Sequence, residues 1–425
     1  MVGLGTVGSG VLKLLQRSRE EFSEKWGIRL DLVCVCDSRR PKEKLRAAGL
    51  SGGTLPSVTR DWRELLRHPG VQVVVELMGG RKEALSLVLS ALRSGKHVVT
   101  ANKEMLAHHW TEIGDCSILA NRHVFFEASV AGGIPLIQSL EHGLASNRIR
   151  RIVGILNGTT NYVLTKMIHE RISQSRALAQ ARQAGFAEKN PRLDMNGTDT
   201  AYKLSILASL VSRRWIAPES IYREGIGRLT LEDLKYVNQE LGQTVRLLGI
   251  FQEVEGQVQA RVHPTLIPHR HPFAAVHGEY NAVLVEGDAA GDLIFYGKGA
   301  GALPAASAVV SDLLALAQGC LSAPVPPVYA KPFVRIQPIG EIVTSYYLRF
   351  QVEDRPGVLS SMSGSLARQG VSIAQVDQRP RFRFPGIPIL IVTHSCRERQ
   401  VRRALQDIST KRFLLQNPVW IRTLQ

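Results

Sequence analysis

The N-terminal segment constrains the fold of this chain more than any other part of it. It opens with GLGTVG, in which Gly3, Gly5 and Gly8 have the spacing of a tight turn from a strand into a helix. One helical run continues to about Glu24, and the apolar segment LDLVCVCD then predicts a strand that ends at Asp37. This order predicts an α/β fold with a parallel sheet, in which the turn and the helix N-terminus hold the pyrophosphate of a dinucleotide.

The residues after this strand bear on which dinucleotide is bound. Asp37 lies where a carboxylate accepts the ribose hydroxyls of NAD, whereas Arg39 and Arg40 could hold the 2′-phosphate of NADP. The arginines fit a solvated loop equally well. We prefer NADP slightly, and the choice between NADP and NAD stays open.

The start of the chain is unusually short for this fold. Only Met1 and Val2 precede Gly3, where the sheet needs a central strand of about five residues. We therefore expect the natural protein to begin upstream of Met1, which mass spectrometry of its N-terminus would test.

Two further apolar segments, VQVVVELMGG and KHVVTANK, predict buried parallel strands that end in turns. Ligands bind at such strand ends in this architecture. We therefore expect Lys103, in the second turn, to point into the site. The alternative is a surface lysine at the start of a helix.

The segment GFAEKNPRLDMNGTDTAYK gathers several charges around a proline and a glycine. Asp199 and Lys203 are four residues apart and share one face if the run that follows is helical, as its apolar spacing indicates. Such a pair is most often a solvated ion pair worth a few tenths of a kcal/mol. Because the helix behind Lys203 is strongly apolar, we expect its amine at the edge of a buried surface.

Read together with NGTTNY (157–162), this segment resembles the homoserine dehydrogenase family. The resemblance implies NAD(P)-dependent, reversible interconversion of L-homoserine and L-aspartate 4-semialdehyde, in the biosynthesis of threonine, methionine and isoleucine. It extends over nearly the whole chain, through ELMGG (76–80), TANKEMLA (100–107), FEASVAGGIPLI (126–137), YREGI (222–226) and HPTLIP (263–268).

The resemblance implies roles for the charged residues. Lys203 would be the general acid and base, with Lys103 a second catalytic group, while Glu188, Asp194 and Asp199 bind the substrate. A lysine is ordinarily protonated at neutral pH, so we expect the Lys103 cation and partial burial to favour the neutral amine of Lys203. The dinucleotide contacts expected from the strand ends and the resemblance are Gly3, Gly5, Thr6, Val7, Gly8, Asp37, Arg39, Arg40, Gly79, Thr100, Lys103, Gly185 and Gly301.

A sodium ion is also implied by the resemblance. Glu127, Val130, Gly132 and Ile134 match positions that bind it mostly through backbone carbonyls. Oxygen ligands suit a hard cation. A plain glycine-rich turn is the alternative.

The C-terminal part predicts the element order βαββαβ beyond a proline-rich stretch at 323–332. With DRPGVL (354–359) in its first turn, this part resembles an ACT regulatory domain. Threonine is the effector to expect, as the end product of the pathway, and a ligand-free dimerisation domain is the alternative. The basic run RPRFRF (379–384) has no functional account.

The chain of 425 residues is too long for one core. We expect a Rossmann-type dinucleotide-binding domain at 1–125, completed by about 298–322, and an α+β catalytic and dimerisation domain at 126–297. A linker at 323–343 then leads to the ACT domain at 344–425.

The composition argues against nucleic-acid and membrane partners. The formal charge is +16, but the basic residues are scattered and only 6% of residues are aromatic. No apolar run approaches the roughly 20 residues of a membrane span, and five cysteines argue against a disulfide framework. We expect a cytoplasmic protein, and by resemblance a homodimer or homotetramer.

Two alternatives compete with an active homoserine dehydrogenase. One is a catalytically impaired paralogue with a regulatory or binding role, favoured by the short first strand and by Lys298 and Ala302, where the family has Pro and Gly. The other is a dehydrogenase acting on a different amino-acid semialdehyde. Retention of Glu188, Asp199, Lys203 and Lys103 favours the active enzyme.

Overall fold

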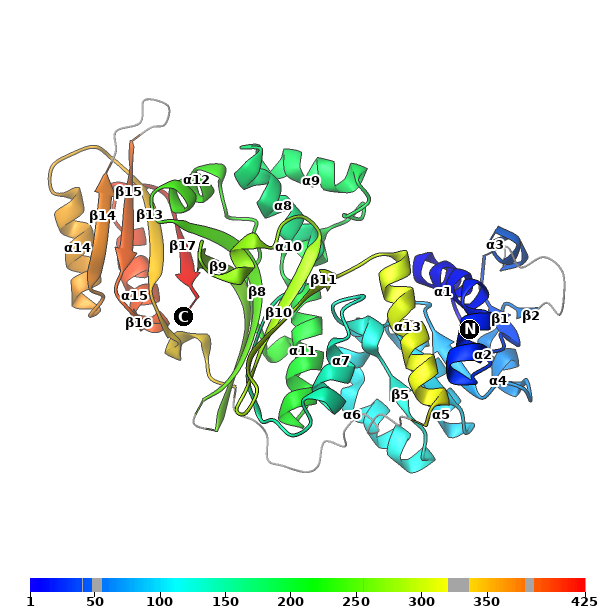
Figure 1. Ribbon diagram of the computed structural model, residues 1–425. Helices are drawn as coiled ribbons and strands as arrows, with labels where there is room; N and C mark the ends of the chain where they lie inside the picture. Colours follow the sequence, from blue (N-terminus) through cyan, green and yellow to red (C-terminus); the bar gives the residue numbers. More distant parts are fainter. Residues whose placement is uncertain (40, 48–55, 255, 320–335, 379–385, 425) are drawn as a thin grey trace. The chain divides into compact units, whose positions relative to one another are not determined.

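The computed structural model describes residues 1–39, 41–47, 56–254, 256–319, 336–378 and 386–424. The chain forms two compact units, each of which combines helices with strands (Figure 1). The domain boundaries expected from the sequence stay predictions. The first unit contains Met1–Gly158, Asp199–Ile221 and Glu279–Val334, and the second contains Thr159–Thr198, Tyr222–Gly278 and Arg335–Gln425.

The first unit contains the predicted parallel sheet. β1 pairs with β2, and β3, β4 and β5 pair in order, all in parallel. Val74 and Val98 are fully buried, as expected where helices cover both faces of a parallel sheet. The strands are β1 (Cys34–Cys36), β2 (Ser57–Thr59), β3 (Val73–Glu76), β4 (His97–Thr100) and β5 (Val124–Phe125).

Met1 and Val2 occupy the central position between β1 and β3. Val2 forms parallel bridges to both Cys36 and Glu76. Its N–H donates to Val75 O at 2.8 Å, and its carbonyl accepts from Leu77 N at 2.8 Å. These two residues therefore join the two groups of strands into one sheet.

The expected single helix after the glycine-rich turn is wrong, because two helices follow it. α1 (Thr6–Arg17) is followed by Ser18, whose φ of −105° and ψ of 14° are not helical. α2 (Arg19–Trp26) begins at the next residue. α13 (Ala302–Ala317) packs along α1 (Figure 1). A Cβ at Gly10 would lie only 2.6 Å from Ala302 O, so glycine permits this close approach.

The rest of the first unit carries the helix predicted after Asp199. α11 (Thr198–Ser212) confirms that prediction, and Leu204 and Leu207 on it are fully buried. An antiparallel group of three strands belongs to the same unit, with β10 (Tyr280–Gly287) between β6 (Ile149–Ile155) and β11 (Gly291–Lys298).

The second unit contains the predicted βαββαβ module. Its strand order is β17-β13-β15-β14, and all of these pairs are antiparallel. β17 also pairs in parallel with β9 (Gln257–Pro268). β9 in turn forms an antiparallel hairpin with β8 (Gln243–Val254). The basic run at 379–384 lies outside the described residues. The module consists of β13 (Tyr346–Val352), α14 (Val358–Arg368), β14 (Ile373–Gln378), β15 (Ile387–Thr393), α15 (Glu398–Ser409) and β17 (Leu414–Thr423).

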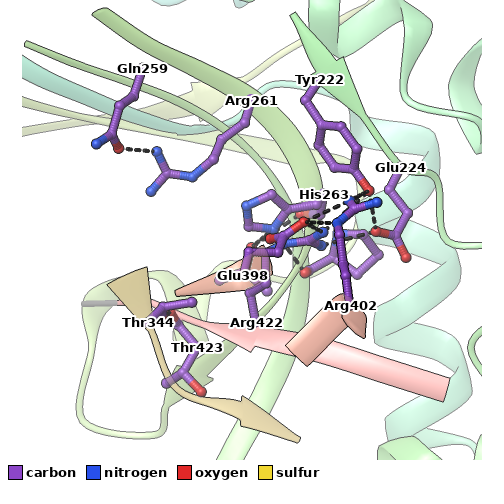
Figure 2. Close-up of polar contacts among 12 residues, drawn as sticks. Tyr222, Glu224, Gln259, Arg261, His263, Thr344, Glu398, Arg402, Arg422 and Thr423 are labelled. Atoms are coloured by element: carbon purple, nitrogen blue, oxygen red, sulfur yellow. Dashed lines mark hydrogen bonds and ion pairs between the residues drawn. The ribbon is translucent and has the colours of Figure 1, made fainter. Parts of the chain in front are cut away.

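A buried ionic cluster ties this module to the short strand β7 (Tyr222–Arg223), as Figure 2 shows. Arg422 on β17 is 1% exposed and donates to Glu398 at 2.6 Å and to Glu224 at 2.9 Å. Arg402 on α15 also pairs with Glu398 and donates to the Tyr222 hydroxyl at 3.1 Å. Because an unpaired buried charge is costly, these partners fix β17 and α15 on β7.

Candidate active site

The glycine-rich turn is shaped by close backbone contacts in the first unit. Gly3 has φ +97°, and a Cβ there would lie 2.5 Å from Leu77 O. A Cβ at Gly8 would lie 2.2 Å from Gly3 O, whereas a Cβ at Gly5 would meet no atom within 4 Å. Gly5 is also the N-cap of α1 and offers no side-chain cap. The first N–H groups of the helix, from Thr6 onward, therefore receive no side-chain cap from Gly5, and uncapped N–H groups at a helix N-terminus suit a pyrophosphate.

Asp37 is buried at the end of β1, and four hydrogen bonds occupy its carboxylate. It accepts from Leu4 N at 2.7 Å, from Arg39 N at 2.8 Å, and from Lys44 Nζ at 2.8 and 2.9 Å. Burial alone would raise the pKa of Asp37, but the bonds from Lys44 and the two amides lower it. Lys44 is a partner that the sequence did not reveal. The Arg39 side chain is exposed, and Arg40 lies outside the described residues.

Glu76 connects the turns that follow β3 and β4. It is fully buried and accepts from Thr100 Oγ1 at 2.6 Å and from Met78 N at 2.9 Å. Burial raises the pKa of Glu76 in spite of these hydrogen bonds. Asn102 donates to Gly80 O at 2.7 Å and caps the helix that Lys103 begins. Glu76 and Asn102 are not among the site residues predicted from the sequence, although a carboxylate in a buried strand was an available signal.

Lys103, Asp199 and Lys203 meet in the first unit. Lys103 is the first residue of α6 (Lys103–Ala120), and its Nζ lies 3.0 Å from Asp199 Oδ1. Lys203 Nζ lies 2.8 Å from Asp199 Oδ2. The side chain of Lys203 is 10% exposed and that of Lys103 is 41% exposed. Asp199 thus bridges one buried amine and one accessible amine.

The residues after β6 complete this group. Asn157 Nδ2 donates to Asp199 Oδ2 at 2.9 Å, and Lys203 Nζ donates to Leu156 O at 2.7 Å. Although burial alone would raise the pKa of Asp199, attraction to Lys203 and Lys103 lowers it well below its ordinary value. The carboxylate is therefore ionised at neutral pH. Asn157 belongs to the NGTTNY motif, but its contact with Asp199 was not foreseen.

Three predicted residues belong to the second unit and are not placed relative to Lys203. Glu188 and Gly185 are exposed, and Gly185 has φ +79°. Asp194 is half-buried in α10 (Arg192–Met195). Their roles stay predictions, as do those of Val7 in α1, Gly79 in its turn with φ +73°, and Gly301 at the N-cap of α13.

The turn proposed for sodium has an unusual backbone. Ala131 and Gly132 have φ +57° and +58°, and a Cβ at Gly132 would lie 2.6 Å from Gly299 O. The Glu127 carboxylate accepts from the N–H groups of Ile137 and Gln138 at 2.9 and 2.8 Å. The Glu127 carboxylate is thus occupied within the chain. Of the carbonyls expected to bind sodium, that of Glu127 accepts from Val130 N at 3.4 Å and that of Ile134 accepts from Leu136 N at 2.8 Å. The described part of the chain holds no group of three or more His, Cys, Asp or Glu arranged as a metal site.

Comparison with known proteins adds three family matches. Residues 3–127 match the NAD-binding domain of homoserine dehydrogenase, residues 135–314 match homoserine dehydrogenase, and residues 346–410 match the ACT domain. In the described residues, no helix has both the length and the hydropathy of a membrane span.

Two relatives are similar over nearly the full length of this chain, and a third is similar over about three quarters of it. The homoserine dehydrogenase of Neisseria gonorrhoeae is 39% identical over 96% of this chain and 94% of its own. The crystal structure of a homoserine dehydrogenase from Thiobacillus denitrificans is 38% identical, covering 100% of this chain and 97% of that one, with a TM-score of 0.92. A hyperthermophilic archaeal homoserine dehydrogenase mutant in complex with NADPH is 26% identical over 74% of this chain and 95% of its own, with a TM-score of 0.62.

Proposed function

This chain belongs to the homoserine dehydrogenase family, and from that premise we propose that Lys103, Asp199 and Lys203 form its catalytic centre. The enzyme catalyses the NAD(P)-dependent, reversible interconversion of L-homoserine and L-aspartate 4-semialdehyde. The observation that carries the proposal is the shared Asp199 carboxylate, with lysine amines at 3.0 and 2.8 Å. The alternative of a catalytically impaired paralogue finds no support.

Lys203 is the proton donor and acceptor in this proposal. A lysine ammonium has three N–H donors, and two of them bond Leu156 O and Asp199. Among the described residues, these two partners leave the third N–H for the substrate oxygen. Lys203 gives this proton to the carbonyl oxygen of the semialdehyde, and in the opposite direction it accepts the proton of the homoserine hydroxyl. When bound, the nicotinamide of NAD(P) supplies or accepts the hydride.

Lys103 is the second cation of the site. It begins α6, where the helix dipole disfavours positive charge, so its place there is supported by the Asp199 pair and not by local helix energetics. Since its side chain is 41% exposed, it can reach a substrate. We assign it to substrate positioning beside Lys203, and by resemblance to the family we assign Glu188, Asp194 and Asp199 to substrate binding.

A spectrophotometric assay tests the function directly. Homoserine-dependent reduction of NADP and of NAD is followed at the absorbance of the reduced nicotinamide. We expect turnover with L-homoserine. Absence of turnover with either dinucleotide, in a folded protein that binds them, would contradict the assigned catalytic centre.

A sodium ion at the carbonyls of Glu127, Val130, Gly132 and Ile134 is a further part of the proposal. The hard oxygen donors fit such a cation. The left-handed backbone of Ala131 supports a functional turn, because a non-glycine residue is strained there. The ion would hold this turn in place. We expect a higher melting temperature in sodium chloride than in choline chloride at equal ionic strength, and equal melting temperatures would count against the ion.

We also propose that threonine acts through the ACT module. Support comes from Arg422, which joins the module to Glu224. Two residues after Glu224, the N–H of Ile226 donates to Met195 O at 3.0 Å. Met195 precedes Asp199 by four residues in the chain. Threonine that changed neither activity nor melting temperature would refute this regulation.

The assembly and location are proposed as a homodimer or homotetramer in the cytoplasm. The edge strand β11 exposes Ile294 and Tyr296, at 43% and 57%, which supports a contact between copies. Sedimentation of the purified enzyme tests the assembly, and a monomer at micromolar concentration would contradict it. Fractionation of the natural cell tests the location.

A further inference from the structure

The Asp37 carboxylate is already saturated within the chain. Both of its oxygens lie within 2.9 Å of Lys44 Nζ, and each also accepts a backbone N–H, from Leu4 or from Arg39. Asp37 is 8% exposed, whereas the Lys44 side chain, on α3 (Pro41–Ala47), is 34% exposed. The buried partner is therefore the anion, and the solvent-facing partner is the cation.

In this fold, an acidic residue at the end of the strand that follows the glycine-rich turn and its helix, where Asp37 lies, ordinarily selects NAD. Its oxygens accept from the ribose hydroxyls, and its negative charge repels the 2′-phosphate of NADP. Here Lys44 opposes both effects, because its ammonium occupies the oxygens and cancels the charge. The exposed Arg39 adds a positive charge beside the pair.

We propose that Lys44 determines the cofactor specificity of this enzyme: closed on Asp37, it withholds the carboxylate from an NAD ribose and presents its ammonium to the 2′-phosphate of NADP. The inference rests on the proposed dehydrogenase and extends it to the adenosine end of the cofactor. A lysine is a suitable partner for a phosphate, since its ammonium donates charge-assisted hydrogen bonds. Lys44 is a specificity residue in this account and takes no part in proton transfer.

The steady-state test uses Lys44→Met, which keeps the aliphatic stem and removes the charge. At saturating homoserine, we expect the ratio of kcat/KM for NADP to that for NAD to fall by at least about tenfold, the scale of one lost charge-assisted hydrogen bond. The KM for NADP should rise, while the KM for NAD should fall as Asp37 is released. Lys44→Arg should keep the wild-type preference. Lys42→Met, at an exposed lysine of the same helix, is the matched control.

A double-mutant cycle tests the mechanism. Because Lys44 already withholds the carboxylate from NAD, Asp37→Asn alone should leave the KM for NAD nearly unchanged. In the Asp37→Asn background, Lys44→Met should no longer lower the KM for NAD, because no carboxylate remains to be released. An unchanged NADP-to-NAD ratio in Lys44→Met, or the same change in Lys42→Met, would overturn the proposal.

Binding without homoserine separates this inference from the catalytic proposal. Calorimetry should show that Lys44→Met raises the Kd of 2′-phospho-ADP-ribose at least about tenfold. The Kd of ADP-ribose should not rise. Equal weakening of both would assign Lys44 a structural role and refute the specificity. Normal discrimination in a protein without turnover would support Lys44 while contradicting the catalytic centre.

Discussion

Replacement of Lys203 by methionine removes the charge and the transferable proton while keeping the length of the side chain. In the native site Lys203 Nζ bonds Leu156 O at 2.7 Å and Asp199 at 2.8 Å. Positioned general acid–base catalysis contributes roughly 10²–10⁴ in rate, or about 3–5.5 kcal/mol. We expect kcat to fall by that factor. The KM for homoserine should change by less than about threefold, because the lost interaction acts chiefly in the transition state.

The stability cost of the same change follows from what remains. Asp199 keeps Lys103 at 3.0 Å and Asn157 at 2.9 Å, so its carboxylate is still partnered after Lys203 is removed. We therefore expect a loss of about 1–3 kcal/mol in the free energy of unfolding, the cost of unsatisfied hydrogen-bond partners. An unpartnered buried charge would cost about 3–5 kcal/mol.

The assay follows homoserine oxidation across pH, with urea unfolding measured on the same samples. Lys203→Arg serves as the matched variant, since it keeps a cation that cannot release its proton. It should lose turnover like Lys203→Met. A folded Lys203→Met enzyme with kcat within tenfold of wild type, or a fully active Lys203→Arg enzyme, would refute the role of Lys203 in proton transfer.

Three further predictions concern other residues. Asp199→Asn leaves Lys203, 8% exposed, without its anion; we expect a loss of about 3–5 kcal/mol in urea unfolding. Because the folded-state pKa of Asp199 is lowered, its contribution to the free energy of unfolding is present above pH about 4 and is lost as the pH falls through the lowered pKa. On acidification, the Asp199→Asn variant should therefore lose less stability than the wild type. Gly8→Ala places a Cβ 2.2 Å from Gly3 O; NADP should no longer raise the melting temperature, and full stabilisation by NADP would contradict the turn geometry. Burial, and after it the nearby arginines, lowers the pKa of His263 far below its ordinary value. The unfolded state therefore binds more protons below pH about 6.5, and the free energy of unfolding falls there by up to roughly 1.4 kcal/mol per pH unit. His263→Gln should flatten that slope between pH about 6.5 and 5, and an unchanged slope would count against a buried neutral imidazole.

Local patterns in the sequence predicted the elements but not all of their limits. The apolar spacing after Asp199 predicted α11, and the C-terminal order predicted the βαββαβ module, because periodicity and turn residues act over short range. The single helix expected after the glycine-rich turn was wrong. Ser18 ends α1 through a non-helical backbone that the helical run did not reveal.

The charged residues illustrate a second limit. The i and i+4 spacing placed Asp199 and Lys203 on one face, yet an exposed pair and a buried centre have the same spacing. The structure distinguishes the two, since Lys203 is buried and Lys103, from a distant segment, shares Asp199. Likewise, the sequence offered Asp37 as a ribose acceptor but did not reveal that Lys44 holds it.

The sequence by itself determined the family, the parallel dinucleotide-binding sheet and the helix that carries Lys203, because motif spacing and hydrophobic period are properties of neighbouring residues. The tertiary structure alone decided which charges meet. It joined Lys103 to Asp199, Lys44 to Asp37 and Arg422 to Glu224. The physical reason is that burial makes an unpartnered charge costly, and only the packed fold decides which charges are buried and which distant partner satisfies each of them.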